Sequence, residues 1–239
     1  AINAGIDMSM VPYEYEEFID NLMELVDEGQ VSMSRIDDAV SKILKLKIEL
    51  GLFENPITNP MDYDKFGSDE FKNMAYQSAA ESITLLKNQN DILPIQKGMK
   101  ILVCGPNANN MRCLNGAWSY SWQGELTDQF ASEYNTILEA MQNRFGKENI
   151  DFVEGVKYKE GGQYYDMLEK NIGDAVKAAS KSDIVLLCLG ETSYTEKPGD
   201  INDITLHELQ LKLAKELVKS GKPIVLVLNQ GRPRLITSI

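Results

Sequence analysis

Two glutamates, Glu191 and Glu196, stand five residues apart in a polar segment that covers residues 190–200. The segment also holds Tyr194 and a Pro-Gly pair, which allows the backbone to turn sharply. A carboxyl group can serve as an acid catalyst when apolar or aromatic surface beside it raises its pKa toward the working pH. Most glutamates in loops are simply solvated, so acid–base chemistry here requires such a surface nearby.

The two tryptophans of the chain, Trp118 and Trp122, could supply that surface. They lie four residues apart in a loop that Gly116 and Gly124 flank. Exposed indole rings form a stacking platform for a flat, partly apolar ligand face, which suits a pyranose ring. The alternative is a small hydrophobic patch within the loop.

The elements that must position these loops are predicted by the pattern of apolar residues. The run at 184–189 predicts a buried parallel strand, and open α/β sheets place their ligands at the carboxyl ends of such strands. Further strands are expected at 101–104, 150–153 and 224–228, and helices at about 136–144, 171–180 and 206–220. This alternation predicts a parallel sheet with helices on both faces. The tryptophan loop follows the first strand, so we expect it at the same sheet edge as Glu196.

The first part of the chain has a different pattern. A helix is predicted over about 14–27, and Ser34 with Asp37 resembles a capping box for a second helix that ends at Gly51. Residues 55–68 are rich in Pro, Asn and Gly and predict a linker, after which a helix is expected over about 70–86. We therefore expect units at 1–54 and 69–239.

Charge and composition exclude several functions. The net charge is −12, from 36 acidic and 24 basic residues without a basic cluster, which makes nucleic acid and acidic membrane surfaces poor partners. A neutral sugar would not be repelled. No apolar run approaches the roughly 20 residues that span a bilayer.

The cysteines and the histidine offer little chemistry. Cys104, Cys113 and Cys188 are odd in number and lack metal-ligand spacing, so we expect buried, reduced thiols. His207 is the only histidine and lies near a predicted helix start, which favours a surface or capping role. With a single histidine, the chain alone cannot form a Ser-His-Asp triad or a His-rich metal site.

A glycine turn after the first predicted strand raises the alternative of nucleotide binding. Gly105-Pro106-Asn107-Ala108 could be a phosphate-cradling turn, but it has none of the features of the G-x-G-x-x-G or GK[ST] motifs. An unrelated nucleotide-binding α/β domain is therefore disfavoured.

Seven segments together make the chain resemble glycoside hydrolase family 3, and within it the β-glucosidases and exo-β-glucan glucohydrolases. They follow the order of the family and cover nearly the whole chain. They are AGIDM (4–8), MSRIDDAV (33–40), GLFENP (51–56), SITLLKN (82–88), WSYSWQG (118–124), GETSYTEKPGD (190–200) and GRP (231–233).

The resemblance implies an architecture and a set of roles. Residues 1–54 are expected to be the last elements of a (β/α)8 barrel, and residues 69–239 most of an α/β sandwich domain, with the chain truncated at both ends. Glu196, rather than Glu191, is expected to be the catalytic acid/base, whereas the nucleophilic Asp is expected upstream of Ala1. Trp122 is expected to line the aglycone side and Met10 to lie near the glucosyl pocket. Trp118 and Glu191 are further substrate-binding candidates.

The resemblance also implies a reaction. Retaining hydrolysis of terminal β-linked glucosyl residues uses two carboxyl groups roughly 5–5.5 Å apart, and it needs no metal or organic cofactor. The expected partners are a β-glucoside or β-glucan oligosaccharide and the remainder of the barrel, and the expected location of the parent protein is periplasmic or secreted. The alternative is a carbohydrate-binding α/β domain without catalysis, which could describe the isolated chain, expected to be inactive.

Overall fold

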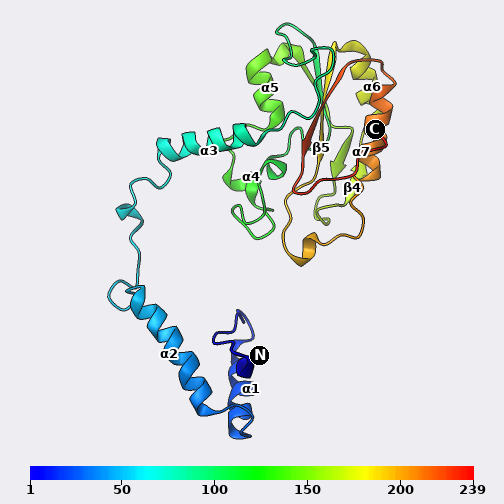
Figure 1. The fold of residues 1–239 in the computed structure, drawn as a ribbon. Helices are drawn as coiled ribbons and strands as arrows, with labels where there is room; N and C mark the ends of the chain where they lie inside the picture. The colour runs from blue at the N-terminus through cyan, green and yellow to red at the C-terminus, as the bar shows by residue number, and fades with distance from the viewer. The chain divides into compact units, whose positions relative to one another are not determined.

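A computed structural model describes residues 1–239, which divide into two compact units, Ala1–Thr84 and Leu85–Ile239. Figure 1 draws the chain as a ribbon, with labels on the α-helices and on strands β4 and β5. The first unit is helical and the second contains every strand. The domain boundary predicted at residues 55–68 is a separate matter from these two units, and it stays a prediction.

The first unit consists of short 3₁₀ turns and three longer helices. They are η1 (Ile2–Ala4), α1 (Tyr15–Asp27), α2 (Met33–Glu49), η2 (Pro60–Asp62) and α3 (Asp69–Ser82). The guanidinium of Arg35 on α2 binds the carboxylate of Asp7 at 2.7 Å and donates to the carbonyl of Ile2 at 2.8 Å. These contacts tie the first residues of the chain to α2.

The capping residue of α2 differs from the prediction. Ser32, not Ser34, caps the helix: its backbone is extended and its hydroxyl accepts the backbone N–H of Arg35. Ser34 already lies within the first turn, where an N-cap geometry is impossible. Helix α3 also ends earlier than expected, at Ser82, because Ile83 adopts an extended conformation.

The second unit is built on a four-stranded parallel sheet. The strands are β1 (Ile101–Cys104), β2 (Ile150–Val153), β5 (Ile184–Gly190) and β6 (Ile224–Asn229), in the order β2-β1-β5-β6. Ile101 of β1 is in register with Ile150 of β2 and with Ile184 of β5. All four strands match the predicted segments to within one residue.

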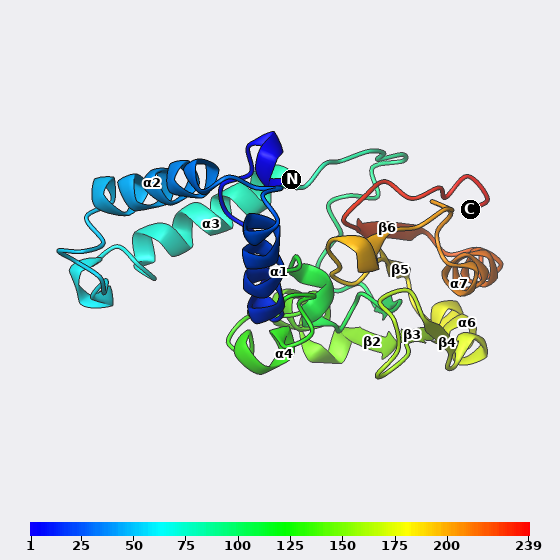
Figure 2. The ribbon, with the colours of Figure 1, turned by 90° about the horizontal axis from the view of Figure 1, so that it is seen from below.

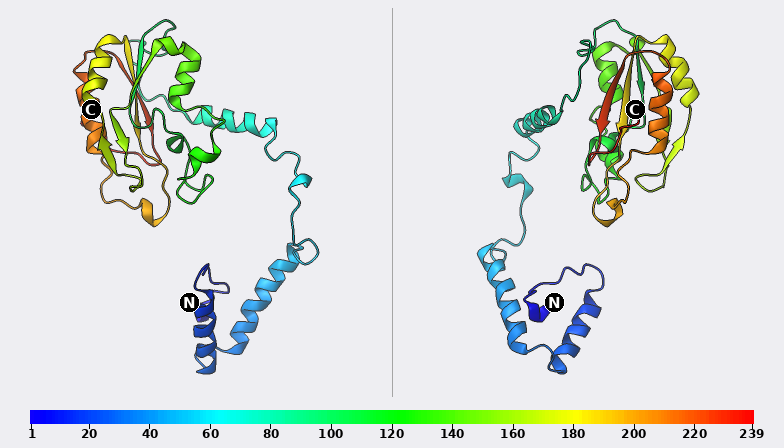
Figure 3. Two further views of the ribbon diagram at one scale, coloured as in Figure 1. Left: turned by 180° about the vertical axis from the view of Figure 1, so that it is seen from behind. Right: turned by 45° about the vertical axis from the view of Figure 1, so that its right-hand side comes forward.

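Helices cover both faces of this sheet, as predicted. On one face, alternate residues of β1 and β5 pack against α6 (Ile172–Lys181) and α7 (Glu208–Val218). On the other face, the remaining residues of these strands pack against α5 (Ile137–Phe145). Figures 2 and 3 show these layers of the second unit from further directions. The α/β sandwich therefore buries β1 and β5 completely.

Short elements complete the second unit. They are η3 (Met111–Leu114), α4 (Thr127–Phe130), η4 (Lys147–Asn149), η5 (Lys197–Gly199) and an antiparallel hairpin of β3 (Val156–Tyr158) and β4 (Met167–Glu169). The sequence did not predict the hairpin, because three-residue strands are too short to show an alternation of apolar and polar residues.

The three cysteines are free and buried, as expected. Cys104 lies in β1 and Cys188 in β5, and burial raises the pKa of each thiol to about 12. None of the helices has the length and apolar character that crossing a bilayer requires.

Candidate functional site

The tryptophan loop and the glutamate loop lie side by side, as the sequence predicted. The side chain of Gln123 joins them: its amide N–H donates to the carbonyl of Thr195 at 3.1 Å, and its amide oxygen accepts the Thr195 N–H at 3.0 Å. The hydroxyl of Ser193 donates to the backbone carbonyl of Gln123 at 2.6 Å. The residue before Glu196 is thus bound directly to the residue after Trp122.

Arg112 of η3 strengthens this junction. Its guanidinium donates to the hydroxyl and the carbonyl of Ser193 at 2.9 and 3.1 Å, and to the carbonyl of Gln123 at 3.1 Å. Gly124 allows the close approach, because a Cβ there would lie 2.4 Å from the Ser193 hydroxyl. The two loops therefore form one tightly connected surface.

Both indoles of this surface are accessible. Trp118 is 68% exposed and Trp122 is 44% exposed. The backbone N–H of Trp118 donates to the backbone carbonyl of Trp122 at 3.0 Å, which closes the loop on itself. Exposed rings in a closed loop can stack on a ligand.

Glu196 is exposed, and its carboxylate makes no hydrogen bond or ion pair within the chain. Its backbone has φ 56° and ψ −154°, a region that residues other than glycine rarely adopt. Such a conformation costs about 1–3 kcal/mol, and it is found mostly at functional sites. The N–H of Gly199 donates to the carbonyl of Glu196 at 2.8 Å and closes the 3₁₀ turn that follows.

Glu191 has the opposite environment. Its carboxylate is buried and binds the guanidinium of Arg234 at 2.8 Å, with the Nε of Arg232 at 3.8 Å. Its second oxygen accepts the Tyr194 hydroxyl at 3.0 Å. The carboxylate is therefore used by the fold, and a substrate-binding role for Glu191 stays a prediction.

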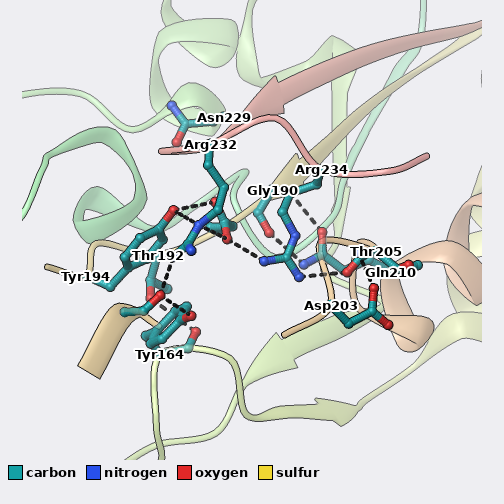
Figure 4. A network of polar contacts seen from close by, with 12 residues as sticks. Tyr164, Gly190, Thr192, Tyr194, Asp203, Thr205, Gln210, Asn229, Arg232 and Arg234 are labelled. Carbon is teal, nitrogen blue, oxygen red and sulfur yellow. Dashed lines mark hydrogen bonds and ion pairs between the residues drawn. The ribbon is translucent and has the colours of Figure 1, made fainter. Parts of the chain in front are cut away.

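Arg232 clamps the far end of the glutamate loop. Its guanidinium lies 4.1 Å from the ring centroid of Tyr194, donates to the hydroxyl of that ring, and donates to the carbonyl of Gly199 at 2.6 Å. Tyr164 contributes a second donor to the same carbonyl at 3.3 Å. Figure 4 shows Tyr164, Tyr194 and Arg232 gathered in this contact. Burial raises the pKa of the Tyr194 hydroxyl, so it stays protonated and can donate to Glu191.

The start of the loop is fixed by buried amides. The side chain of Gln210 both donates to and accepts from the backbone of Gly190 at 2.8 Å, and Asn107 donates to the carbonyls of Glu191 and Asn229 at 3.2 and 3.1 Å. Gly190 has φ 144°, and a Cβ there would lie 1.7 Å from the Asn229 oxygen. The turn at residues 105–108 therefore serves to hold the loop, with its only amide side chain buried and engaged.

A pocket of about 260 Å³ lies beside the buried carboxylate. Glu191, Arg234, Tyr164 and His207 line it, whereas Glu196 and the two tryptophans do not. His207 caps α7, with its Nδ1 accepting the Leu209 N–H at 3.1 Å, which confirms the capping role. Of the residues predicted for the site, this pocket therefore includes Glu191 but neither Glu196 nor the tryptophans.

Met10 is the remaining residue predicted for the site. Met10 is 95% exposed in the first unit, and no group of His, Cys, Asp or Glu side chains in the chain is arranged to hold a metal ion. Gln123, Arg112 and Arg232 were not predicted as site residues. Gln123 directly follows a tryptophan that had drawn attention, and Arg232 lies in one of the segments that carried the resemblance, so both had a usable signal.

Together these features define an α/β sandwich whose tryptophan and glutamate loops follow the carboxyl ends of β1 and β5 in its parallel sheet. Residues 83–239 match the sequence model described as "Glycosyl hydrolase family 3 C-terminal domain", and residues 1–46 match that of "Glycosyl hydrolase family 3 N terminal domain". The chain belongs to glycosyl hydrolase family 3.

Named relatives agree with this assignment. The chain is 40% identical over 243 residues to a lysosomal beta glucosidase of Dictyostelium discoideum, covering 99% of the chain and 29% of the relative. It is 30% identical over 255 residues to a periplasmic beta-glucosidase of Salmonella typhimurium, covering 98% of the chain and 32% of the relative. The chain therefore spans about a third of the length of these relatives.

Solved structures agree as well. The crystal structure of a beta-glucosidase from Listeria innocua in complex with glucose aligns with a TM-score of 0.76 at 29% identity. The alignment covers 99% of this chain and 30% of that one. The membership of a glycoside hydrolase family that the sequence implied is confirmed.

Proposed function

We propose that this chain is part of a retaining β-glucosidase or exo-β-glucanase that removes terminal β-linked glucosyl residues from the non-reducing end, with Glu196 as the acid/base. The observation that carries the proposal is the exposed carboxylate of Glu196, free of partners within the chain and held in a rare backbone conformation beside a loop with two exposed indoles. The glucosidase names of the relatives support the reaction class.

The proposed reaction proceeds in two steps. A nucleophilic carboxylate, which we assign to no residue of this chain, bonds to the anomeric carbon while the bond to the leaving oxygen breaks. Glu196 in its acid form gives that oxygen its proton. Glu196 as a carboxylate then takes a proton from water, which attacks the anomeric carbon and releases the nucleophile.

The indoles have a supporting part in this proposal. Trp122, at 44% exposure, offers a stacking face for the aglycone, and Trp118 extends the aromatic surface. Met10 and Glu191 are proposed as further substrate contacts, with Met10 on the glucosyl side. Glu191 lines the pocket of about 260 Å³, where its carboxylate already contacts Arg234 and Tyr194.

The proposal extends to the surroundings of the enzyme. We place the complete protein in the periplasm or outside the cell, as one named relative is periplasmic, although another is lysosomal. A carbohydrate-binding role without catalysis is the second candidate, because exposed indoles alone are sufficient for stacking on a sugar. Residues 1–239 alone are expected to show no turnover.

The test uses the complete polypeptide that contains these residues. Glu196→Ala should reduce turnover of β-glucosides that need a protonated leaving group by about 10²–10⁴-fold, the usual contribution of general acid–base catalysis. Azide should accelerate the variant on an activated aryl β-glucoside, because the anion attacks the glycosyl-enzyme without needing a base, and it should yield the β-glucosyl azide.

The matched control is Glu160→Ala, which removes another exposed loop glutamate of the same unit. It should leave turnover unchanged. Full turnover in Glu196→Ala, or a loss that azide does not relieve, would contradict the assignment. Sugar binding without any turnover in the unaltered complete protein would favour the second candidate.

A further inference from the structure

The backbone of Glu196 cannot keep its conformation without help from its surroundings. A residue with a side chain stays at φ 56° and ψ −154° only where neighbouring groups hold it there. The contacts that do so lie on either side of it, at Thr195 before it and at Gly199 after it. Gln123 binds Thr195, and Arg232 together with Tyr164 binds the carbonyl of Gly199.

Gln123 holds the first side. Its side-chain amide forms two hydrogen bonds with the backbone of Thr195: it donates to the Thr195 carbonyl and accepts the Thr195 N–H. A side-chain amide offers a donor and an acceptor on one planar group, which an ionised carboxylate does not. The backbone of Gln123 is itself fixed by Arg112 and Ser193, so the anchor is rigid.

Arg232 holds the second side. Its guanidinium donates to the Gly199 carbonyl at 2.6 Å, and the Gly199 N–H donates to the Glu196 carbonyl at 2.8 Å. The same guanidinium lies over the ring of Tyr194 and donates to its hydroxyl, so it fixes both the start and the end of the turn. A planar fork of donors is needed for this, which lysine lacks.

We infer that Gln123 and Arg232 are positioning residues, which aim the Glu196 carboxylate by fixing the backbone on either side of it. This inference rests on the acid/base role proposed for Glu196. Neither residue needs to touch the substrate. Loss of either anchor lets the turn relax toward an ordinary conformation, and a displacement of about 1 Å at a reacting group can cost on the order of 10²-fold in rate.

Positioning and general structural support predict different kinetics. A misplaced acid slows substrates whose leaving group needs a proton, but it spares the first step for leaving groups that depart as stable anions. A weakened fold or a distorted pocket slows both kinds of substrate alike. Comparing an alkyl β-glucoside with 2,4-dinitrophenyl β-glucoside therefore separates the two roles.

The experiment compares Gln123→Glu and Arg232→Lys with Glu196→Ala in the complete polypeptide. We expect each anchor variant to lower kcat for the alkyl β-glucoside by about 10–100-fold, with KM nearly unchanged. The formation of the glycosyl-enzyme from 2,4-dinitrophenyl β-glucoside should fall no more than a few-fold, and azide should accelerate its turnover. The controls are Gln129→Glu and Arg144→Lys, exposed positions of the same unit that contact neither anchor, and both should behave like the unaltered protein.

The outcomes distinguish the inference from the function on which it rests. If Glu196→Ala shows the dependence on the leaving group but both anchor variants lose the two substrates equally, or lose neither, the inference is wrong and the acid/base assignment stands. If Glu196→Ala lacks the dependence, the assignment itself is wrong. Gln123 lies in a surface loop outside both core clusters, so Gln123→Glu decides the matter even if Arg232→Lys does not fold.

Discussion

Glu191 and Glu196 belong to one loop and carry the same functional group, yet the fold treats them in opposite ways. Glu191 is buried, with one oxygen on Arg234 and the other on Tyr194. Glu196 is exposed and unpaired, and its backbone is strained. Burial with partners engages one carboxylate in the fold, whereas the other has a strained backbone and no partner within the chain. Five residues of separation are enough for this division, because the loop turns between them.

The contrast also shows where free energy is stored. Removing the Glu191 carboxylate from water is costly, and the opposite charges of two arginines offset that cost only as long as the whole cluster is intact. The Glu196 backbone is unfavourable in itself and is kept by anchors on both sides. Substitutions at Glu191 should therefore lower mainly the free energy of unfolding, and substitutions at Glu196 should lower mainly the proposed activity.

The largest effect on stability is expected where the buried cluster is broken. Glu191→Gln removes the charge but keeps the shape, which leaves the guanidinium of Arg234, whose side chain is only 11% exposed, without its counter-ion. The free energy of unfolding should fall by about 3–5 kcal/mol, measured by urea denaturation. Glu160→Gln, at an exposed loop position, should change it by less than about 0.5 kcal/mol. A loss below about 1 kcal/mol for Glu191→Gln would mean that the buried contacts of Glu191 contribute little to stability, so that the contrast with Glu196 is wrong.

A smaller effect of opposite sign is expected at the strained position. Glu196→Gly should be more stable than Glu196→Ala by about 1 kcal/mol, because glycine tolerates φ 56° while alanine keeps the strain. The unfolded chain gains some freedom with glycine, which offsets part of the relief. Thermal unfolding of the two variants, which both lack the carboxylate, isolates the backbone from the charge. Equal stability would show that the turn is not strained.

The smallest effect concerns His207, which lines the same pocket as Glu191. Burial lowers the pKa of His207 from its ordinary value near 6.5, so the folded protein binds the proton less readily than the unfolded chain. The contribution of neutral His207 to stability is thus complete above about pH 6.5 and is lost as the pH falls from there through the lowered pKa. The cap on Leu209 is lost with it, since a protonated Nδ1 cannot accept a hydrogen bond.

His207→Asn should weaken that pH dependence, since an asparagine oxygen caps a helix at any pH. We expect the unfolding free energy of the unaltered protein to drop more between pH 7.5 and 5 than that of the variant, by about 0.5 kcal/mol. Urea denaturation at both values measures the difference. Parallel pH profiles of the two proteins would show that protonation of His207 does not affect the stability of the fold.

The sequence was sufficient to predict the parallel sheet of the second unit and the helices that cover it. Strands β1 and β5 are continuous apolar runs because both of their faces are covered, and that signal is local. The adjacency of the tryptophan and glutamate loops followed from the same sheet, since the ends of neighbouring parallel strands meet at one sheet edge. The family relationship was also evident from the ordered segments.

The contacts made by Gln123 and by Arg234 could not be predicted from local sequence patterns. Gln123 and Thr195 are 72 residues apart, and Arg234 and Glu191 are 43 apart. Nothing near Glu191 in the sequence indicates that its charge will be neutralised from another strand end, so the two glutamates could not be told apart by composition. The mistaken cap at Ser34 has the same origin on a smaller scale, because either serine could have begun the helix.

The buried thiols have a practical consequence for studying the loop. With pKa values of about 12 at Cys104 and Cys188, and all three sulfurs inside the fold, alkylating reagents find almost no thiolate to attack. Within residues 1–239, a cysteine introduced at the exposed Lys197 would then be the one fast-reacting thiol, so a dye attached there would label the glutamate loop selectively.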